Sequence, residues 1–330
     1  MDTDSKTISV IILSDGKAGH LKQSLAVAHL IDHASIHIIP FSYKNSLHRF
    51  FLTLLAYPPL PILLKKFFFP KKLAEIKGDI VISTGSSLAP LTFLYAKNHS
   101  AKSIVIMRPL WGLTYDLKII PKHDHPKPSS NTVITLGAPT KISEINLEPY
   151  AQKLVHKLPP SSRKMMSIFI GKESPPILIQ KIDRVCRSQN MDLLITTSRR
   201  TSGESIQKIK TVFSHHPHCR LLIIPTEMTQ PEHLVEGMLG LAKLILVTED
   251  SVSMISEAAS SGKKVIVIET ECLRKHKEMI QTLVREGYIS TASASDLEKV
   301  VVEKLRDTRP VKKLQDSVLI KEALQRLLCT

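Results

Sequence analysis

The stretch from Leu244 to Glu269 constrains the fold most, because two short apolar runs flank a single helical pattern within it. The runs 244–247 and 265–268 are aliphatic and short enough to be buried parallel strands. Between them, apolar residues from Val252 to Ala259 recur at helical spacing. A strand, a helix and a second parallel strand form a βαβ unit, so this stretch predicts an α/β protein.

A polar turn precedes this helix and suggests a binding role. Thr248 or Asp250 can cap the helix. Backbone N–H groups beside Asp250 and Ser251 would then point out of the carboxyl end of a parallel sheet, where such sheets bind anions. Ser253 and Glu257 lie one turn apart on another face of the helix. The alternative for the stretch alone is an ordinary βαβ unit with a polar cap.

Composition indicates a globular protein that has an anionic partner. The chain has 330 residues, 43% of them hydrophobic and 23% charged, which suits two soluble domains. The net charge of +15 favours nucleic acid, an anionic membrane surface or a phosphate-bearing substrate. The sequence has no aromatic RNA-binding motif, zinc-finger spacing or helix-turn-helix signature, so we do not expect nucleic acid to be the partner.

Cysteine usage and the first residues favour a reducing compartment. The 4 cysteines lie far apart without a CxxC pair, as expected for free thiols. The start MDTDSKTISVIIL lacks the basic region and cleavage site of a signal peptide. We therefore expect a cytoplasmic protein, with peripheral attachment to the inner face of a membrane left open. No cofactor motif is present, and we expect no cofactor.

The first candidate loop joins a β-rich run at 8–13 to a helical pattern. Gly16 and Gly19 let the backbone of this loop approach a ligand closely, but the pattern is not the GxGxxG dinucleotide fingerprint. His20 stands at the junction of loop and helix, where an imidazole can act as a general base at neutral pH. Asp15 is a second candidate base. The alternative for His20 is a solvated or capping histidine.

The same arrangement recurs further along the amino-terminal half. A strand at 79–83 is followed by Gly85 and Ser86 and then by another helical pattern. His123 and Asp124 follow a later strand within a loop bounded by prolines. Together with His125 they could be read as metal ligands, but all three lie in this one loop with no partner from another part of the chain in view, so we expect no metal.

The segment 48–72 has the most unusual composition in the chain. Its apolar runs are broken by prolines and are too short to cross a bilayer, which needs about twenty apolar residues. Its clustered aromatic residues and its lysines at 65, 66, 71 and 72 suit shallow docking on an anionic membrane surface. The alternative is a helical excursion that packs against its own domain.

The second half begins after a segment of linker character. Residues 157–164 read KLPPSSRK, and a new set of strands begins at Met166. We therefore expect an amino-terminal domain at 1–158 and a carboxyl-terminal domain at 159–330, with a return of the last helix to the first domain left open.

A strand at 192–196 in this half feeds a loop that contains Ser198, Arg199, Arg200 and Thr201. Paired arginines just beyond a strand end are well placed to grip a diphosphate, because a guanidinium presents a fork of donors to phosphate oxygens. The alternative for this pair is a surface ion pair.

Several of these motifs, in this order, resemble a known family. The matching segments are Ser14–His20 with Gln23, His123–Asp124, Thr197–Thr201 and Thr248–Ala258. Together they are similar to the family of the plant mitochondrial fission protein called elongated mitochondria and to its bacterial relatives. The resemblance spans most of the chain and implies the GT-B fold, in which two Rossmann-like domains with parallel sheets face a cleft.

A more distant similarity concerns the peptidoglycan glycosyltransferase that adds N-acetylglucosamine to a lipid-linked precursor. The loop from Asp15 to His20 and the segment 79–90 resemble its two glycine-rich loops. The similarity implies that His20 is a candidate base and that Glu257 holds the donor ribose. Two departures stand out: Gly85 is followed by serines, and Gly171-Lys172 stands where a glycine pair is expected.

The prediction is thus an inverting, metal-independent glycosyltransferase that moves a sugar from a nucleotide-sugar donor to a membrane-associated or envelope glycan acceptor. The alternative is a non-catalytic, membrane-associated scaffold protein that retains the fold. The predicted catalytic residues are His20 and Asp15. The predicted donor-binding residues are Ser198, Arg199, Arg200, Thr201, Glu249, Asp250, Ser251, Ser253 and Glu257. The predicted acceptor-binding residues are Gly16, Gly19, Gly85, Ser86, His123 and Asp124.

Overall fold

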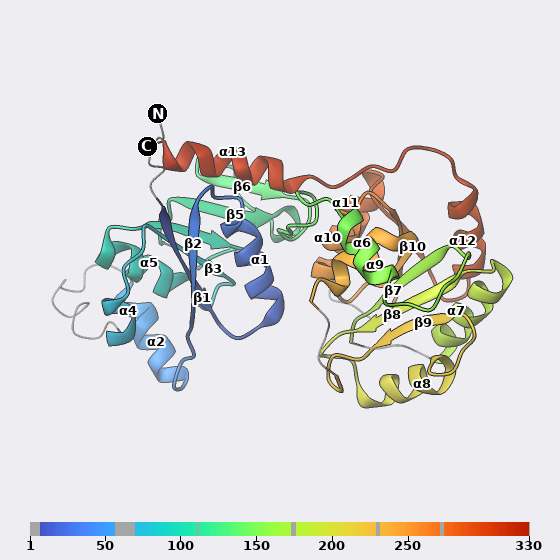
Figure 1. The fold of residues 1–330 in the computed structure, drawn as a ribbon. Coiled ribbons are helices and arrows are strands. Elements are labelled where there is room, and N and C mark those ends of the chain that lie inside the picture. Colours follow the sequence, from blue (N-terminus) through green and yellow to red (C-terminus); the bar gives the residue numbers. More distant parts are fainter. Residues whose placement is uncertain are drawn as a thin grey trace. The chain divides into compact units, whose positions relative to one another are not determined.

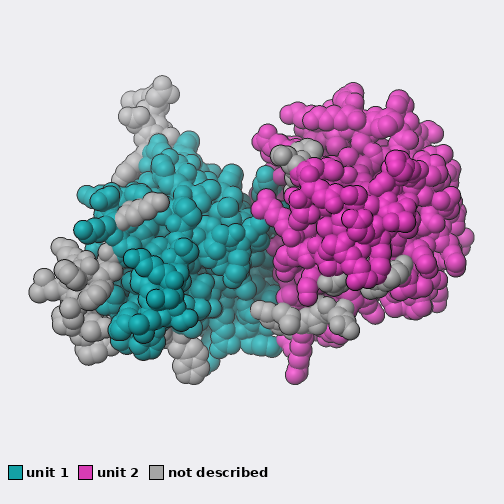
Figure 2. Space-filling view, turned by 90° about the horizontal axis from the view of Figure 1, so that it is seen from below, with its two compact units in different colours: residues 1–141, 316–330 teal, residues 142–315 magenta. Residues whose placement is uncertain are grey.

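The structure is a computed structural model that describes residues 7–56, 70–110, 112–172, 176–228, 232–270 and 274–329. Much of the predicted membrane segment, at 57–69, lies outside these residues. The chain forms two compact units, which Figure 2 distinguishes by colour. Unit 1 contains residues 1–141 and 316–330, and unit 2 contains residues 142–315.

Unit 1 is built on one parallel sheet of six strands in the order β2-β1-β3-β4-β5-β6. The strands are β1 (Ile8–Ser14), β2 (Ala34–Pro40), β3 (Ile80–Thr84), β4 (Lys102–Ile106), β5 (Leu117–Pro121) and β6 (Thr132–Thr135). Every residue of β3 is buried, as expected for a central strand that is covered on both faces.

Helices cover both faces of this sheet. They are α1 (Ala18–Ala28), α2 (Ser46–Leu55), α4 (Lys71–Glu75), α5 (Ala89–His99) and α13 (Asp316–Leu328), with the 3-10 turn η1 (Lys122–Asp124) after β5. Apolar residues of α1 and α13 pack on one face of the sheet, where α13 lies against β5 and β6 (Figure 1). Residues of α2, α4 and α5 pack on the other face.

Unit 2 has its own parallel sheet of six strands in the order β12-β11-β10-β7-β8-β9. The strands are β7 (Met165–Ile170), β8 (Asp192–Thr197), β9 (Cys219–Ile223), β10 (Ala242–Thr248), β11 (Lys264–Ile268) and β12 (Ser290–Ala292). The helices are α6 (Glu148–Val155), α7 (Pro176–Ser188), α8 (Gly203–Phe213), α9 (Leu234–Leu241), α10 (Val252–Ala259), α11 (Arg274–Arg285) and α12 (Leu297–Arg306). The predicted α/β class with two parallel sheets is confirmed.

The unit boundary lies at 141/142, whereas the sequence analysis placed it at 158/159. The difference arises from α6, which precedes the linker but packs along α9. Gly237 and Gly240 of α9 permit this close approach, since an ideal Cβ on Gly240 would lie 2.8 Å from the Cβ of Ala151. The linker at 157–164 therefore connects two elements of unit 2.

Residues 316–330 belong to unit 1, and a buried carboxylate fixes where α13 begins. Asp316 accepts hydrogen bonds from the backbone N–H of Leu136 (3.0 Å) and of Gly137 (2.7 Å), just beyond β6. Ile320, Ala323 and Leu324 continue into the core of the sheet. Within the described residues, no helix is both long enough and apolar enough to cross a membrane.

Candidate functional site

The order of strands marks one crevice in each sheet. In a parallel sheet, a crevice opens at the carboxyl ends of two neighbouring strands whose connections run in opposite directions, and ligands bind there. In unit 1 this switch lies between β1 and β3, and in unit 2 it lies between β7 and β10. The loop Asp15–His20 and Gly85 follow the first pair of strands, and Gly171 and the turn at 249–251 follow the second.

At the crevice of unit 1, His20 and Asp15 form a pair. Nδ1 of His20 lies 2.9 Å from Oδ2 of Asp15, and Nζ of Lys17 lies 3.2 Å from the same oxygen. Burial raises the pKa of Asp15, but His20 and Lys17 outweigh it and lower this pKa below the ordinary value. Asp15 is therefore a carboxylate, and it holds Nδ1 of the ring. His20 neither caps α1, whose N-cap is Lys17, nor lies fully in solvent.

Gly85 brings this pair to β3. The φ of Gly85 is +93 and that of Gly16 is +81, and both are left-handed values that favour glycine. An ideal Cβ on Gly85 would lie 2.9 Å from Cε1 of His20, so the imidazole rests directly on the glycine backbone. The structure thus joins the predicted residues His20, Asp15 and Gly85, while Ser86 is exposed beside them and Gly19 lies within α1.

The other predicted acceptor residues follow β5 in the same sheet. The backbone N–H of Gly85 donates to the carbonyl of Ile106 at the end of β4, and Met107 N–H donates to Ile119 of β5. Successive strand ends therefore lead from Gly85 to η1, where His123 is buried. The carbonyl of Asp124 accepts a hydrogen bond of 3.3 Å from Nη1 of Arg108.

At the crevice of unit 2, Asp250 supports the loop after β7. Its carboxylate accepts hydrogen bonds from the N–H of Lys172 (2.5 Å) and from the hydroxyl of Thr248 (2.7 Å). An ideal Cβ on Gly171 would lie 2.2 Å from the oxygens of this carboxylate, so only glycine fits there. Asp250 and Thr248 are occupied in this way, and the expectation that one of them caps α10 is wrong.

The loop after β8 braces the same glycine. The hydroxyls of Ser198 and Thr201 both donate to the carbonyl of Gly171. The side chains of Arg199 and Arg200 are exposed, and neither forms an ion pair or side-chain hydrogen bond with another described residue. The alternative of a surface ion pair therefore does not apply, and both guanidinium groups remain open to an anion.

The N-terminus of α10 lacks a side-chain cap. Its N-cap residue is Ser251, whose hydroxyl makes no capping hydrogen bond, so the first N–H groups of the helix keep their partial positive charge. Glu249 is buried, and its Oε1 accepts a 2.7 Å hydrogen bond from the N–H of Thr270, which makes it a brace between loops. Ser253 and Glu257 are half-buried on α10.

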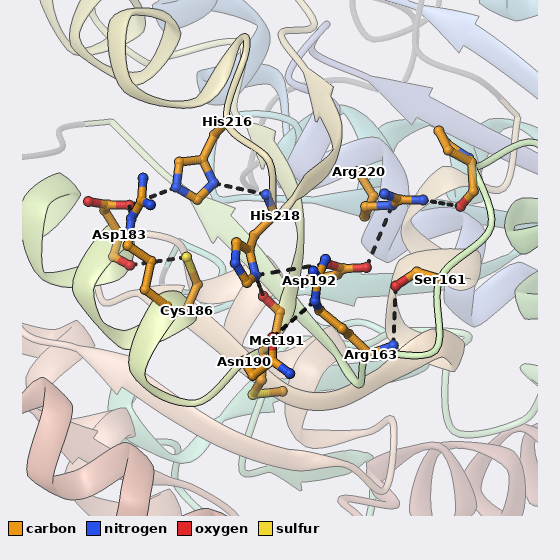
Figure 3. Close-up of polar contacts among 12 residues, drawn as sticks. Ser161, Arg163, Asp183, Cys186, Asn190, Met191, Asp192, His216, His218 and Arg220 are labelled. Atoms are coloured by element: carbon orange, nitrogen blue, oxygen red, sulfur yellow. Dashed lines mark hydrogen bonds and ion pairs between the residues drawn. The ribbon is translucent and has the colours of Figure 1, made fainter.

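One further cluster resembles a metal site by composition. Donor atoms of Asp183, Cys186 and His216 lie within 4.8 Å of one another (Figure 3). Arg187 already donates to Asp183 Oδ1 at 2.8 Å. The backbone N–H of His218 donates to Nδ1 of His216, so the proton of the His216 ring lies on Nε2. This Nε2 is 2.8 Å from Oδ1 of Asp183, but the geometry does not form a hydrogen bond. A proton on Nε2 leaves no lone pair there for a metal, so this cluster gives no reason to assign a metal, and the absence of a metal stays a prediction.

Two basic residues at these crevices received no role from the sequence. Lys17 binds Asp15, and Lys172 is exposed at the loop that Asp250 supports. Each directly follows a glycine at a strand end, in Gly16-Lys17 and Gly171-Lys172. That repeated dipeptide is the signal that would have identified them.

Two Rossmann-like domains with parallel sheets and a crevice in each define the GT-B class. The fold is that of MurG from Acinetobacter baumannii (TM-score 0.53, 12% identity, covering 96% of this chain and 99% of that one). It is also that of the UDP-GlcNAc 2-epimerase from Neisseria meningitidis bound to UDP-GlcNAc (TM-score 0.58, 14% identity, covering 97% of this chain and 100% of that one). The calicheamicin glycosyltransferase CalG4 shares this fold as well (TM-score 0.53, 10% identity, covering 98% of this chain and 93% of that one).

Within this class, the chain belongs to the family described as Mitochondrial fission ELM1, whose model matches residues 18–313. The resemblance inferred from the sequence motifs is therefore confirmed. An uncharacterized protein of Rickettsia prowazekii is 24% identical over 356 residues, which cover 92% of this chain and 96% of that protein.

Proposed function

We propose that the protein is a glycosyltransferase that transfers a sugar from a nucleotide-sugar donor with inversion and without a metal ion. The observation that carries this proposal is the set of open donors at the crevice of unit 2. Arg199 and Arg200 have no anionic partner among the described residues, and the N-terminus of α10 is uncapped. Such groups suit the diphosphate of a donor and offset the charge that develops as it leaves.

The catalytic base in this proposal is His20. With Nδ1 held by Asp15, the ring presents Nε2 to an acceptor hydroxyl. The acceptor oxygen attacks the anomeric carbon while the bond from that carbon to the diphosphate breaks. The proton passes to Nε2, and the leaving diphosphate keeps the electron pair. A single displacement of this kind inverts the configuration at the anomeric carbon.

The donor ribose in this proposal is held by Glu257. Its carboxylate accepts hydrogen bonds from ribose hydroxyls, while Ser253, one turn before it, lies nearer the helix start and the diphosphate. Asp250 and Glu249 contribute by position only, since their carboxylates hold loop N–H groups. The UDP-GlcNAc bound to the Neisseria meningitidis epimerase is consistent with a nucleotide sugar in this fold.

The acceptor in this proposal is a membrane-associated or envelope glycan, and α2 supports it. Leu47, Phe50, Phe51 and Leu54 form one face of this helix and are 62%, 60%, 52% and 45% exposed. We call these four residues the α2 apolar face. The sequence has no acidic residue between Asp32 and Glu75. An exposed aromatic face within a stretch that lacks acids suits an anionic membrane surface.

Isothermal titration calorimetry with UDP, GDP, CMP and ADP sugars tests the donor assignment. We expect one nucleotide class to bind the full chain, and Glu257→Ala to weaken its binding by about tenfold, because a hydrogen bond to a charged group contributes roughly 1.5–3 kcal/mol. The matched control is Glu303→Ala, since Glu303 is exposed on α12, away from the crevice. If no nucleotide sugar binds the folded protein, the proposed reaction is wrong. An unchanged affinity of the Glu257 variant would remove that residue's role alone.

A further inference from the structure

An open hollow lies at the amino edge of the sheet of unit 2, the edge opposite the donor residues. Its volume is about 720 Å³, and we call it the amino-edge hollow. Its lining residues are Pro160, Ser161, Ser162, Arg163, Asn190 and Arg220. They come from the linker that precedes β7, from the end of α7 and from the start of β9. Figure 3 shows several of their side chains converging.

A buried acid behind the hollow holds its two arginines. Asp192, the first residue of β8, has no exposed surface. Its Oδ1 lies 3.2 Å from Nη1 of Arg163, and its Oδ2 lies 3.6 Å from Nε of Arg220. A fully buried carboxylate is tolerated only with such compensation. Asp192 holds Arg163 by a hydrogen bond, whereas its contact with Arg220 is an ion pair without a hydrogen bond. The acid itself is not among the residues that line the hollow.

Each arginine keeps one terminal nitrogen that makes no hydrogen bond within the described residues. Arg163 uses Nε on the side-chain oxygen of Asn190 and Nη1 on Asp192. Arg220 uses Nη2 on the carbonyls of Pro159 and Pro160. Its Nε makes no hydrogen bond within the described residues, but it is buried 3.6 Å from Asp192 Oδ2 and is not exposed to a ligand. Nη2 of Arg163 and Nη1 of Arg220 remain, and the hydroxyl of Ser162 is also unpaired within the described part of the chain. The groups left to a ligand are therefore donors.

The charge of the hollow also favours a ligand that accepts hydrogen bonds and carries negative charge. Two guanidinium groups face one carboxylate, and His218 adds an imidazole with Nδ1 4.0 Å from Asp192 Oδ1. The lining contains no acidic residue. Guanidinium donors in a fixed orientation, with serine hydroxyls beside them, match the oxygens of a phosphate group. The volume falls in the range of small-molecule sites, which hold a ligand larger than one phosphate.

We propose that the amino-edge hollow binds a phosphate-bearing small molecule, at a site separate from the donor crevice of the same unit. The phosphate lies between Nη2 of Arg163 and Nη1 of Arg220 and accepts from Ser162. Because the linker carries Ser161, Ser162 and Arg163, an occupied hollow ties the linker to β8 and β9. The proposal does not depend on the chain's being a glycosyltransferase.

Ser162 offers a test that leaves the buried network intact, since it is exposed and makes no hydrogen bond with another described residue. Ser162→Glu places a negative charge in the lining, and Ser162→Gln adds the same bulk without charge. Both are made in a full chain that carries Arg199→Gln and Arg200→Gln, which weakens phosphate binding at the donor crevice. Calorimetry with inorganic phosphate, pyrophosphate and ADP at constant ionic strength then measures binding without the two arginines of the donor crevice. The α10 N-terminus and Glu257 are still present, so the comparison of the two Ser162 variants assigns the binding to the hollow.

We expect at least one probe to bind the Arg199/Arg200 variant, and Ser162→Glu to weaken it by about tenfold or more while Ser162→Gln changes it by less than about threefold. Tighter binding of ADP than of pyrophosphate identifies a nucleotide as the ligand class, and equal binding identifies phosphate alone. Equal affinities in the Glu and Gln variants would overturn the proposal, and so would the failure of all three probes to bind. Arg184→Gln, at an exposed arginine of α7 that does not line the hollow, is the control for net charge.

Discussion

Gly85 and Gly171 each occupy a place where a neighbouring side chain takes the volume that a Cβ would need. At Gly85 the neighbour is the imidazole of His20, and at Gly171 it is the carboxylate of Asp250. Both glycines follow strands beside a switch point of their sheet. The two contacts define how closely the loops of each crevice pack, and they connect residues that are far apart in the sequence.

Gly85→Ala tests whether the position of the His20 ring matters to the reaction. A methyl group at φ +93, 2.9 Å from Cε1, strains the backbone and pushes the ring away from Asp15. We expect sugar transfer to fall at least about tenfold while donor affinity changes by less than about twofold. Gly203→Ala is the control, because an ideal Cβ there meets nothing within 4 Å. Full transfer by the Gly85 variant would contradict a catalytic role for the ring in this position.

At this scale the sequence predicted residue types better than contacts. His20 and Asp15, five residues apart across a loop, were each expected as a candidate base, and the structure shows that they form a pair. The bond of Asp250 to Lys172 joins residues 78 apart, and no local pattern reports it. For that reason Asp250 was expected to cap α10, whereas tertiary structure uses its carboxylate elsewhere.

Among the elements, the strands could be predicted because parallel strands covered on both faces are continuous apolar runs. β3, β7 and β8 have every residue buried, and each was expected within a residue or two of its bounds. β12 was not expected, because three residues, Ser290–Ala292, carry too little apolar pattern at a sheet edge. For the segment that contains α2, a helical excursion packed on its own domain was the alternative to membrane docking. The exposed face of α2 follows only from the packing of its other face.

That α2 apolar face is the element-scale test of membrane contact. Phe50→Ser with Phe51→Ser removes two exposed aromatic rings without touching Leu52 and Leu55, which are buried against unit 1. We expect the apparent affinity for vesicles of phosphatidylcholine and phosphatidylglycerol, measured by flotation, to fall at least about tenfold. Thermal unfolding of this variant should match that of the parent chain.

Two comparisons sharpen the vesicle experiment. Ile177→Ser is the matched control, because Ile177 is 50% exposed on α7 of unit 2. Vesicles of phosphatidylcholine alone separate apolar insertion from attraction between the basic chain and anionic lipid. If the Phe50/Phe51 variant floats with anionic vesicles as well as the parent chain does, α2 is not the membrane contact.

For the whole molecule, α13 determines whether unit 1 has a complete core. Leu324 is 1% exposed and belongs to the core cluster of this sheet, where α13 lies against β5 and β6, whereas Leu319 of the same helix is 48% exposed. Leu324→Ser should destabilise unit 1 by about 2–5 kcal/mol, since a large buried side chain is lost and a hydroxyl is buried. Leu319→Ser should change the free energy of unfolding of unit 1 by less than about 0.5 kcal/mol. Differential scanning calorimetry measures both, and equal unfolding temperatures would show that α13 does not stabilise unit 1.

The division of the molecule was harder to anticipate than its class. Composition marked 157–164 as a linker, yet α6, which precedes it, packs on α9 of unit 2. The boundaries between the two units therefore lie at 141/142 and 315/316. Unit 1 is thus made of two segments that are distant in the sequence. Local composition reports flexibility along the chain, whereas unit boundaries depend on which helices pack together.

The division of unit 1 into two segments affects the order in which the two units can fold during synthesis. The six strands of unit 1 are synthesised first, but the helix that covers β5 and β6 is synthesised only after all of unit 2. Apolar residues of the first sheet consequently stay uncovered while the ribosome adds residues 142–315. Unit 2, which is contiguous, can fold during that interval. We therefore expect unit 1, although its synthesis begins first, to finish folding last, and we expect chaperones to bind nascent chains chiefly at β5 and β6.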